Sequence, residues 1–339
     1  MKTWLYGLLL LLSLTTCVDT IEFTPQAKDD FLVVDARITD REGPHIVKLT
    51  RTDVVGRSAR FPAEAGAEVV IIENEAITHY LSEVTPGEYH LNQVTGVAGH
   101  TYKLRIRLAN GHQYESEQEV MPQPLPLSRS FFEFDRNQTL SVFSYVTIPE
   151  DMSEGPYLKW QFEHVYQITD LVCNPFDPAL TCYFQIPRNN QLLPVLDASK
   201  IERGATVQQL ISTVGVTGTT FGEKNYFTIV RESITFNALV YWDRISRLIS
   251  SSGSIFDVPP GGVRSNIRRS DAPDEWVLGY FYAAAEQVEH LPILPSDFAP
   301  LRINPYCGAL GFPPVPFPQE CCFCTLLVNN RIPRPDYWR

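Results

Sequence analysis

The chain has 339 residues, which is enough for two domains. Its 39 acidic residues outnumber its 28 lysines and arginines, the formal net charge is −11, and no block of basic residues is present. This balance argues against binding to nucleic acid, because such binding depends on clustered lysine and arginine that neutralise phosphates. Its 26 prolines and 12% aromatic residues, with few long helical patterns, favour β-structure with irregular connections.

The N-terminus has the features of an export signal. Lys2 precedes an apolar run at 4–14, which is shorter than the ~20 residues that a membrane-spanning helix needs. The run ends in LTTC, which resembles a lipoprotein signal box, with Thr16 where glycine, alanine or serine is usual. We therefore predict that residues 1–16 are cleaved and that Cys17 is lipidated. The alternative is an ordinary secretory signal with an incidental cysteine.

Strand-like stretches follow in quick succession. The clearest lies at 100–108, where apolar residues alternate with basic ones, a period of two that buries one face of a strand. Asn110 and Gly111 after it predict a type I′ hairpin turn. Segments of this kind recur about every ten residues, as in an immunoglobulin- or transthyretin-like sandwich. They lie at 31–38, 45–51, 66–72, 77–82, 88–92, 100–108 and 112–121.

The second half of the chain is also rich in β-branched and aromatic residues. One helix is predicted at 235–250, where apolar residues recur at three- and four-residue spacing and Thr235 can cap the N-terminus. The region 174–224 is polar and less regular. The tail at 294–339 is rich in proline and cysteine, so we expect covalent links to order it. Strands are predicted at 140–148, 157–168, 225–234 and 276–293.

These patterns predict a mainly β fold. An N-terminal immunoglobulin- or transthyretin-like β-sandwich is followed by a larger β-rich domain with one long helix and a disulfide-stapled C-terminal tail. The predicted boundaries are 1–16 for the signal, 17–30 for a tether, 31–121 for the sandwich and 122–339 for the second domain, with its helix at 235–250 and its cysteine-rich tail at 307–339.

Export determines how the cysteines are interpreted. Without Cys17 an even number remains, in an oxidising compartment where disulfides persist. Cys173 and Cys182 flank a short proline-containing loop and could close a small ring. Cys307 is near enough to pair with one of the terminal three, and a bond between the adjacent pair is disfavoured by its geometry. The disulfide candidates are Cys173, Cys182, Cys307, Cys321, Cys322 and Cys324.

Zinc is the sharpest alternative for the terminal cysteines, since three thiolates and a fourth ligand would suit its tetrahedral geometry. The C-x₂-C spacing of zinc motifs is missing, however, and the tail contains no histidine. Redox catalysis would require Cys321 and Cys324 to act as a C-x-x-C pair with an activated thiolate. We therefore predict structural disulfides, with no metal and no cofactor.

Motifs for catalysis are weak. The stretch Ser252-Gly253-Ser254 does not match the nucleophile elbow G-x-S-x-G, and no spacing nominates a pair of carboxylates for glycoside hydrolysis. His79, His90 and His100 lie on predicted strands, where a surface or hydrogen-bonded core imidazole is expected. We assign no catalytic residue and predict no enzymatic activity.

Tryptophans offer another possibility, because aromatic side chains can stack on sugars. Trp160, Trp242 and Trp276 have tyrosine and phenylalanine neighbours. On strands and on an amphipathic helix such residues are more often part of the core.

Several stretches together resemble the Bacteroidota lipoprotein family of domain of unknown function 4249. The resemblance covers nearly the whole mature chain. Phe323 departs from it, because the family commonly has Asp between the terminal cysteines, and so does Tyr183, where Trp is common. The matching stretches are the signal box, "FLVVDARITD…HIVKLTRT", "GAEVVI", "GEYHL…GVAGHTYKLRI…GHQYESE", the Cys182 region, "GSIFDVPPGGVRSNI", "VLGYFYAA" and "ECCFC…RPDYW".

The resemblance implies an outer-membrane lipoprotein with an N-terminal β-sandwich, often encoded beside TonB-dependent, SusC-like receptors, and without an established activity. We therefore expect a non-enzymatic, lipid-anchored protein that acts as an accessory or ligand-capture partner of such a receptor, on either face of the outer membrane. The lipid is the expected attachment, since no second apolar stretch is long enough to cross a membrane. The alternative is a stand-alone carbohydrate-binding or adhesive module at the cell surface, and a glycan hydrolase ranks third.

Overall fold

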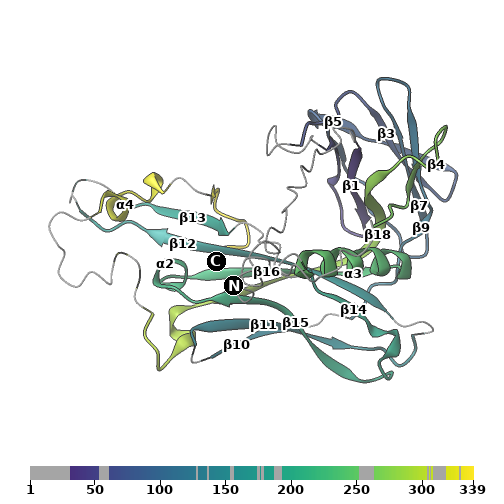
Figure 1. Ribbon diagram of the computed structural model, residues 1–339. Helices are drawn as coiled ribbons and strands as arrows, with labels where there is room; N and C mark the ends of the chain where they lie inside the picture. Colours follow the sequence, from purple (N-terminus) through teal and green to yellow (C-terminus); the bar gives the residue numbers. More distant parts are fainter. Residues whose placement is uncertain are drawn as a thin grey trace, which may run out of the picture.

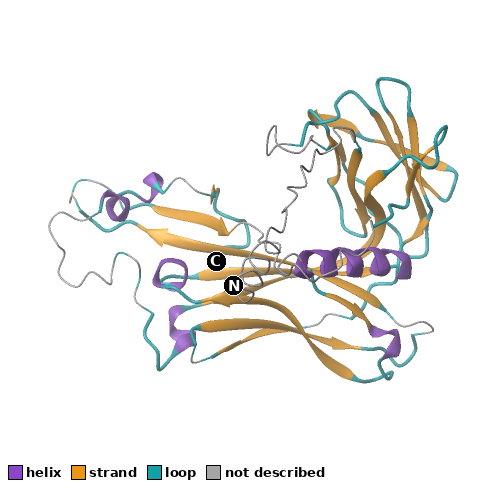
Figure 2. Cartoon of the chain, viewed as in Figure 1, coloured by secondary structure: helices purple, strands orange, loops and turns teal. Residues whose placement is uncertain are grey.

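Figure 1 shows the computed structural model of the chain. The described part consists of three β-sheets with one long helix, as the colours of Figure 2 make plain. The predicted mainly β fold is therefore confirmed. The structure describes residues 31–52, 61–126, 129–135, 137–152, 156–173, 176, 179–186, 193–251, 263–303, 305, 307, 318–327 and 330–339.

The N-terminal part is a β-sandwich with one apolar core. The period-two pattern predicted at 100–108 is confirmed: Tyr102, Leu104 and Ile106 are fully buried, whereas the basic residues between them are partly or fully exposed. One sheet contributes β1 (Leu32–Thr39), β2 (His45–Arg51), β5 (Ser82–Thr85) and β6 (Glu88–Leu91), and the other contributes β3 (Glu68–Glu73), β4 (Ile77–Tyr80), β7 (Thr101–Arg107), β8 (Gln113–Ser116), β9 (Glu119–Val120) and β17 (Ile267–Arg269).

The hairpin between β7 and β8 differs from the prediction in its turn. A type I′ turn needs a positive φ at both central residues, but Gly111 has one (φ 89°) and Asn110 does not. The N–H of Gly111 donates to the carbonyl of Leu108 at 2.9 Å, so a longer loop ends in a left-handed glycine. Positive φ at two successive residues occurs instead at Asn74 (48°) and Glu75 (59°), between β3 and β4.

One strand, β18 (Val277–Ile293), belongs to both halves of the molecule. Its first part pairs in parallel with β1, and its second part pairs antiparallel with β16 (Asn225–Ile234). Gly279 has a φ of 93°, and a Cβ there would lie 1.8 Å from the carbonyl oxygen of Val34, so glycine is required where the strands approach. Because β17 also pairs with β8, late segments of the chain complete the sandwich begun by residues 31–121.

The second half is layered. A three-stranded sheet packs on one face of the large sheet, and the long helix lies on the other face (Figure 1). The strands predicted at 140–148, 157–168, 225–234 and 276–293 are present. The first and last strands of this half, at 130–134 and 331–332, were not predicted, and neither were those within 174–224, where β15 alternates threonine, glutamine and apolar residues without one clear apolar face. The remaining strands are β10 (Ser130–Phe134), β11 (Thr139–Thr147), β12 (Tyr157–Thr169), β13 (Thr181–Ile186), β14 (Val195–Asp197), β15 (Thr206–Gly215) and β19 (Arg331–Ile332).

The long helix α3 (Phe236–Ser251) confirms the helix predicted at 235–250. The hydroxyl of Thr235 accepts a hydrogen bond from the N–H of Ala238 at 3.2 Å, as expected of an N-cap. The same hydroxyl donates to the carboxylate of Glu119 on β9 at 2.6 Å, so the helix begins against the sandwich. The short helices are α2 (Gly218–Phe221), α4 (Gln319–Cys322), η2 (Ala198–Lys200), η3 (Pro295–Phe298) and η4 (Cys324–Leu326).

Two disulfides hold the tail on the second half, and a third lies within the tail. The expectation that Cys307 pairs with one of the terminal three is met by Cys321, but the small ring between Cys173 and Cys182 is not formed. Each of those two bonds a terminal cysteine instead, because β19 pairs with β13 and brings the tail alongside. The bonds join Cys173 to Cys322, Cys182 to Cys324 and Cys307 to Cys321.

Candidate functional site

The six paired cysteines have a structural role. Their sulfur atoms are taken up in S–S bonds with Cα separations of 5.5 to 6.0 Å, so the terminal trio offers no thiolate for a metal or for redox catalysis. The disulfide-linked tail is also held by the buried carboxylate of Asp170, which accepts a hydrogen bond from the N–H of Cys324 at 2.6 Å. Cys17, the predicted lipidation site, lies outside the described residues.

The last residues of the chain are part of the fold. Trp338 is buried, and its indole N–H donates to the side-chain oxygen of Gln167 at 3.0 Å. The ring of Tyr337 stacks on that of His290, with 3.8 Å between the centroids. The aromatic end of the tail thus docks on β12 and β18 beyond the disulfides.

Other residues considered from the sequence have ordinary partners. His79 and His100 both contact the carboxylate of Glu73, at 2.8 and 2.6 Å, and His90 contacts Glu88 at 2.7 Å, as expected of hydrogen-bonded imidazoles. Among the tryptophans, Trp160 is fully buried and Trp242 half-buried, whereas Trp276 is exposed at 44% and is not a core residue. The candidate Ser252-Gly253-Ser254 lies outside the described residues.

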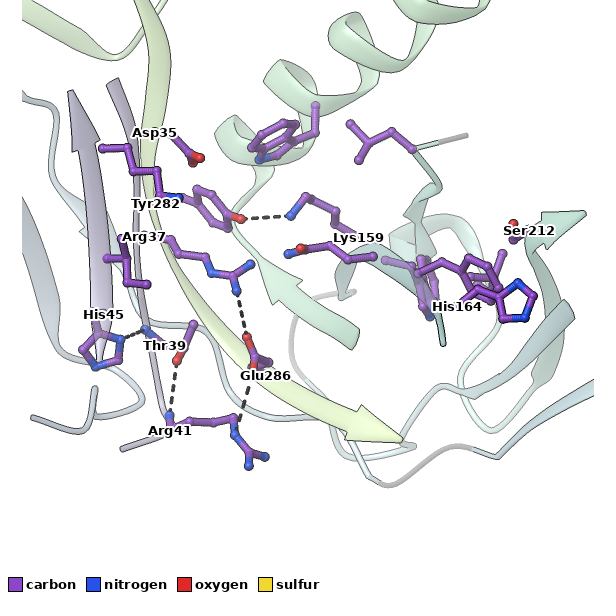
Figure 3. A pocket seen from close by; sticks show the side chains of 18 of the residues that line it. Asp35, Arg37, Thr39, Arg41, His45, Lys159, His164, Ser212, Tyr282 and Glu286 are labelled. Atoms are coloured by element: carbon purple, nitrogen blue, oxygen red, sulfur yellow. Dashed lines mark hydrogen bonds and ion pairs between the residues drawn. The ribbon is translucent and has the colours of Figure 1, made fainter. Parts of the chain in front are cut away.

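A cleft of about 960 Å³ at the junction of the two halves was not predicted. The sandwich strands β1 and β2 line one end, β15 lines the other, and β12, β18 and α3 contribute side chains between them. Figure 3 shows Arg37, Arg41 and Glu286 at the first end, His164 and Ser212 at the second, and Lys159 in the middle. Its volume is at the upper end of small-molecule sites, which span ~300–1,000 Å³.

A buried carboxylate organises the polar side of this cleft. Glu232 on β16 is fully buried and forms an ion pair with Lys159 of β12. It also accepts from the guanidinium of Arg37 at 2.6 Å. The side-chain amide of Gln161 donates to it at 3.0 Å and the hydroxyl of Tyr282 at 3.2 Å. We call Arg37, Lys159, Glu232, Tyr282 and Glu286 the charged junction.

Strand register explains why these residues meet. Lys159 is paired directly with Glu232, and Glu232 with Glu286. Arg37 of the sandwich is paired directly with Tyr282 on the shared strand. Charged side chains on four neighbouring strands therefore converge on one sheet face. The available sequence signal was a lysine flanked by apolar residues in YLKWQF and two adjacent charges within the strand-like IVRESI, but such charges are usually taken as solvent-facing.

Lys159 and Glu232 both keep their charges at neutral pH. Burial opposes ionisation of Glu232, but the ammonium of Lys159 and the guanidinium of Arg37 outweigh it and hold the pKa of Glu232 below its usual value. Burial likewise disfavours the Lys159 ammonium, yet the Glu232 carboxylate raises the pKa of Lys159. The ring of Trp242 lies 4.7 Å from this ammonium. Losing either partner would leave an uncompensated buried charge.

The carboxylate of Glu286 has weaker ion pairs than that of Glu232. Its carboxylate is only 11% exposed, and its ion pairs with Arg37 and Arg41 are long, at 3.5 and 3.7 Å. Burial raises the pKa of Glu286, and the neighbouring Glu232 adds to the effect despite the two guanidinium groups. This carboxylate therefore faces the cleft with acceptor capacity that its neighbours do not fill.

Polar atoms without partners occur on both faces of the large sheet next to the cleft. Among the described residues, four buried side-chain polar atoms have no hydrogen-bond partner, and three belong to cleft-lining residues: Nε1 of Trp160, Nε1 of Trp242 and Nδ1 of His164. Leaving such an atom unpaired costs ~1–3 kcal/mol.

The protonation of His164 can be assigned from its surroundings. The side-chain amide of Asn225 donates to the carbonyl of Glu223 at 2.9 Å, so its oxygen faces Nε2 of His164 at 2.6 Å. Nε2 therefore carries the hydrogen, and Nδ1 is an acceptor. Burial lowers the pKa of His164 to about 4, so the ring is neutral at pH 7. This acceptor lies against the rings of Phe221 and Phe227, in the core between the large sheet and the three-stranded sheet.

A partly exposed aromatic row lies elsewhere, on the outer face of the three-stranded sheet. Phe131 stacks on Phe143 and on Tyr145, with centroid distances of 5.3 and 4.6 Å and interplanar angles of 19° and 23°. Rings stacked in this way cover one another's faces, so the row stabilises the sheet and does not present a flat platform to a sugar.

Comparisons place the chain in a family but not in a functional class. A family model described as "Domain of unknown function (DUF4249)" matches residues 18–290. No curated protein matches the chain. A solved chain described as "Cytokine receptor complex - Crystal form 1A" is 11% identical, with 60% of this chain and 84% of that chain covered, and its TM-score of 0.20 is too low to support a shared fold. Within the described residues, no helix combines the length and apolar character needed to cross a bilayer.

Proposed function

The chain belongs to the DUF4249 family, and on that basis we propose that it is a non-enzymatic, lipid-anchored protein of the outer membrane. In this proposal it captures a ligand in the cleft and acts as the partner of a TonB-dependent, receptor-like barrel. The anchor is the lipid on Cys17. The three disulfides support export, because such bonds persist in oxidising compartments.

The cleft is the observation that carries the binding function. Ligand sites are concave, largely preformed and found where two structural units meet, and this cleft of about 960 Å³ lies where the sandwich joins the second half. The charged junction fixes its polar side before any ligand arrives, since β1, β12 and β18 each contribute a partner to Glu232. Preorganisation of this kind lowers the entropic cost of binding.

The protonation states favour binding over catalysis. A nucleophilic lysine needs a lowered pKa, whereas the Glu232 carboxylate raises that of Lys159. A general base works best with a pKa near the operating pH, whereas burial lowers that of His164 to about 4. Both groups are thus held in states that suit recognition.

The proposal is tested by affinity purification of the tagged chain from detergent-solubilised outer membranes. We expect a barrel protein among the co-purified partners, and we expect lipid on residue 17. A Cys17→Ser variant should lose the lipid and the membrane fraction together, while a Cys17-preserving Thr20→Ala variant controls for changes near the signal. Purification without any barrel protein would contradict the receptor partnership.

A further inference from the structure

The strand β15 forms an edge of the three-stranded sheet, because among the described strands it pairs only with β11. It has ten residues, whereas the other described strands with a single partner have two to five. Its sequence TVQQLISTVG contains no charged residue and no proline, whereas each of those others except β4 carries a charge. Shortness, charge and proline protect a free edge from pairing with another chain, and β15 lacks all three.

The cleft runs along the backbone of β15. Five consecutive residues of this strand, 211–215, line it, and Ser212 marks this stretch in Figure 3. Side chains of consecutive strand residues alternate between the two faces of a sheet. A space that all five residues border therefore lies beside the edge of the strand and not over one face. This is the place where a further strand would pair.

The register with β11 shows which backbone groups face this space. The N–H of Val216 donates to the carbonyl of Gln138 at 2.8 Å, so the backbone polar groups of Val216 point to the β11 side. Such groups alternate in direction along a strand, and the bulge of β15 lies before this stretch, at Ile211. The N–H and C=O groups of Thr213 and Gly215 therefore point away from β11. No other described strand pairs with this side of β15.

The surroundings indicate which side chains an added strand would need. The inner face of the three-stranded sheet packs on the large sheet through apolar residues such as Val142 and Val214. A strand added beside β15 continues this face, and Phe162, Ile186 and Leu193 offer apolar surface in the cleft. Apolar residues are therefore required at every second position, with polar residues between them on the outer face.

We propose that the cleft captures an extended peptide, which pairs with Thr213 and Gly215 as a strand added to the free edge of β15. This assignment rests on the proposed ligand-capture function and names its ligand class. Main-chain hydrogen bonds supply the affinity in this mode of recognition, and alternate side chains supply the preference. A second copy of the chain could also pair with a free edge, but this edge borders a cleft, which suits a single extended strand better than the side of a folded sheet.

Titration of the purified full chain in detergent, followed by calorimetry, tests the proposal. The first probe is a capped decapeptide in which valine alternates with threonine between two terminal lysines. A second probe has the same composition in an order without alternation. We expect the alternating peptide to bind and the reordered peptide to bind about tenfold more weakly or worse, because its apolar side chains do not share one face.

Two methylated forms of the alternating peptide test the edge pairing. One carries N-methyl groups on its threonines and the other on its valines, so each lacks the backbone donors along one edge and keeps every side chain. A peptide held through one edge should lose at least tenfold in affinity in one form and little in the other. If both forms bind equally, or neither binds, the peptide is not held through one edge and the proposal is wrong.

Variants locate the site. Thr213→Pro removes a backbone donor that faces the cleft, and Thr213→Lys adds the kind of charge that protects edges. Each should weaken binding of the alternating peptide by about tenfold or more. Thr147→Lys should leave it unchanged, because this exposed threonine lies on β11, which has partners on both sides. If Thr213→Pro fails to fold, Thr213→Lys decides the outcome.

Absence of binding by the alternating peptide would overturn the proposal, as would binding that survives the substitutions at Thr213. Analytical ultracentrifugation without peptide tests the second copy, and a dimer that Thr213→Lys separates would also overturn it. Failure here is distinguishable from failure of the receptor partnership, because the titration uses the protein alone and the membrane purification uses no added peptide.

Discussion

The charged junction and the cysteine-rich tail both fasten distant segments to the large sheet, but by different means. At the junction, side chains from four strands converge on one buried carboxylate. At the tail, two covalent bonds span sequence separations of 149 and 142 residues. A segment with little regular structure gains most from covalent links, whereas a wall that borders an open cleft can be fixed by polar contacts that also face the ligand.

The two regions should therefore fail under different conditions. Cystine sulfur does not titrate, so the tail should respond to reductant and hardly to pH. The junction contains groups whose pKa values burial and neighbouring charges move in opposite directions, so it should respond to pH and hardly to reductant.

Removing both long-range disulfides should have the largest effect. Once one is closed, the other closes only the short ring formed by 173–182 and 322–324, so a single loss should cost about 3 kcal/mol. Losing both opens the long loop as well, and the cost should exceed twice the single value. Urea unfolding of serine variants of Cys173 with Cys322, of Cys182 with Cys324, and of all four measures this. Strictly additive losses would contradict the shared-loop explanation.

Glu232→Gln should rank next, with a loss of about 3–5 kcal/mol, because Lys159 is then buried without a counter-charge. The double variant Lys159→Met with Glu232→Leu should recover much of that loss, since it removes both charges at similar volume. Urea unfolding of both proteins provides the comparison. Equal losses in the single and double variants would show that packing, and not charge pairing, dominates at this position.

Glu286→Gln should have the smallest effect on the free energy of unfolding. The contribution of Glu286 should depend on pH in the direction opposite to that of Glu232. Its pKa is raised above the ordinary value of 4.5, so the folded state binds the proton more tightly. The free energy of unfolding then falls as pH rises from 4.5 through the folded pKa. Glu286→Gln should remove this fall and leave the protein slightly more stable at pH 7. Glu232, whose pKa is lowered, should instead lose its contribution as pH falls below 4.5.

Thermal unfolding between pH 4 and pH 8 checks the sign, with Glu115→Gln as the control on the sandwich surface. Parallel curves for the wild type and Glu286→Gln would show that Glu286 titrates normally.

Local patterns in the sequence predict much of the fold. Alternation identifies β7, and the apolar stripe with Thr235 identifies α3. The turn type at Asn110 was wrong because an Asn-Gly pair also fits a longer loop that needs only the glycine in the left-handed region. The strands β13, β14 and β15 were missed because their mixed residues acquire a buried face only through partners distant in sequence.

The cleft and the exact cysteine pairs depend on long-range register. Lys159 and Glu232 are 73 positions apart, and only the pairing of β12 with β16 makes them neighbours. Likewise, Cys173 bonds Cys322 because the tail runs back along β13, which its closeness to Cys182 in sequence cannot show. The sequence therefore identified the cysteines that form disulfides, but it did not identify the cleft beside β18.

Affinity purification of the tagged chain from detergent-solubilised outer membranes tests the central claim most directly. We predict lipid on Cys17 and a barrel protein among the co-purified partners. Purification of the lipidated protein without any barrel protein would contradict it.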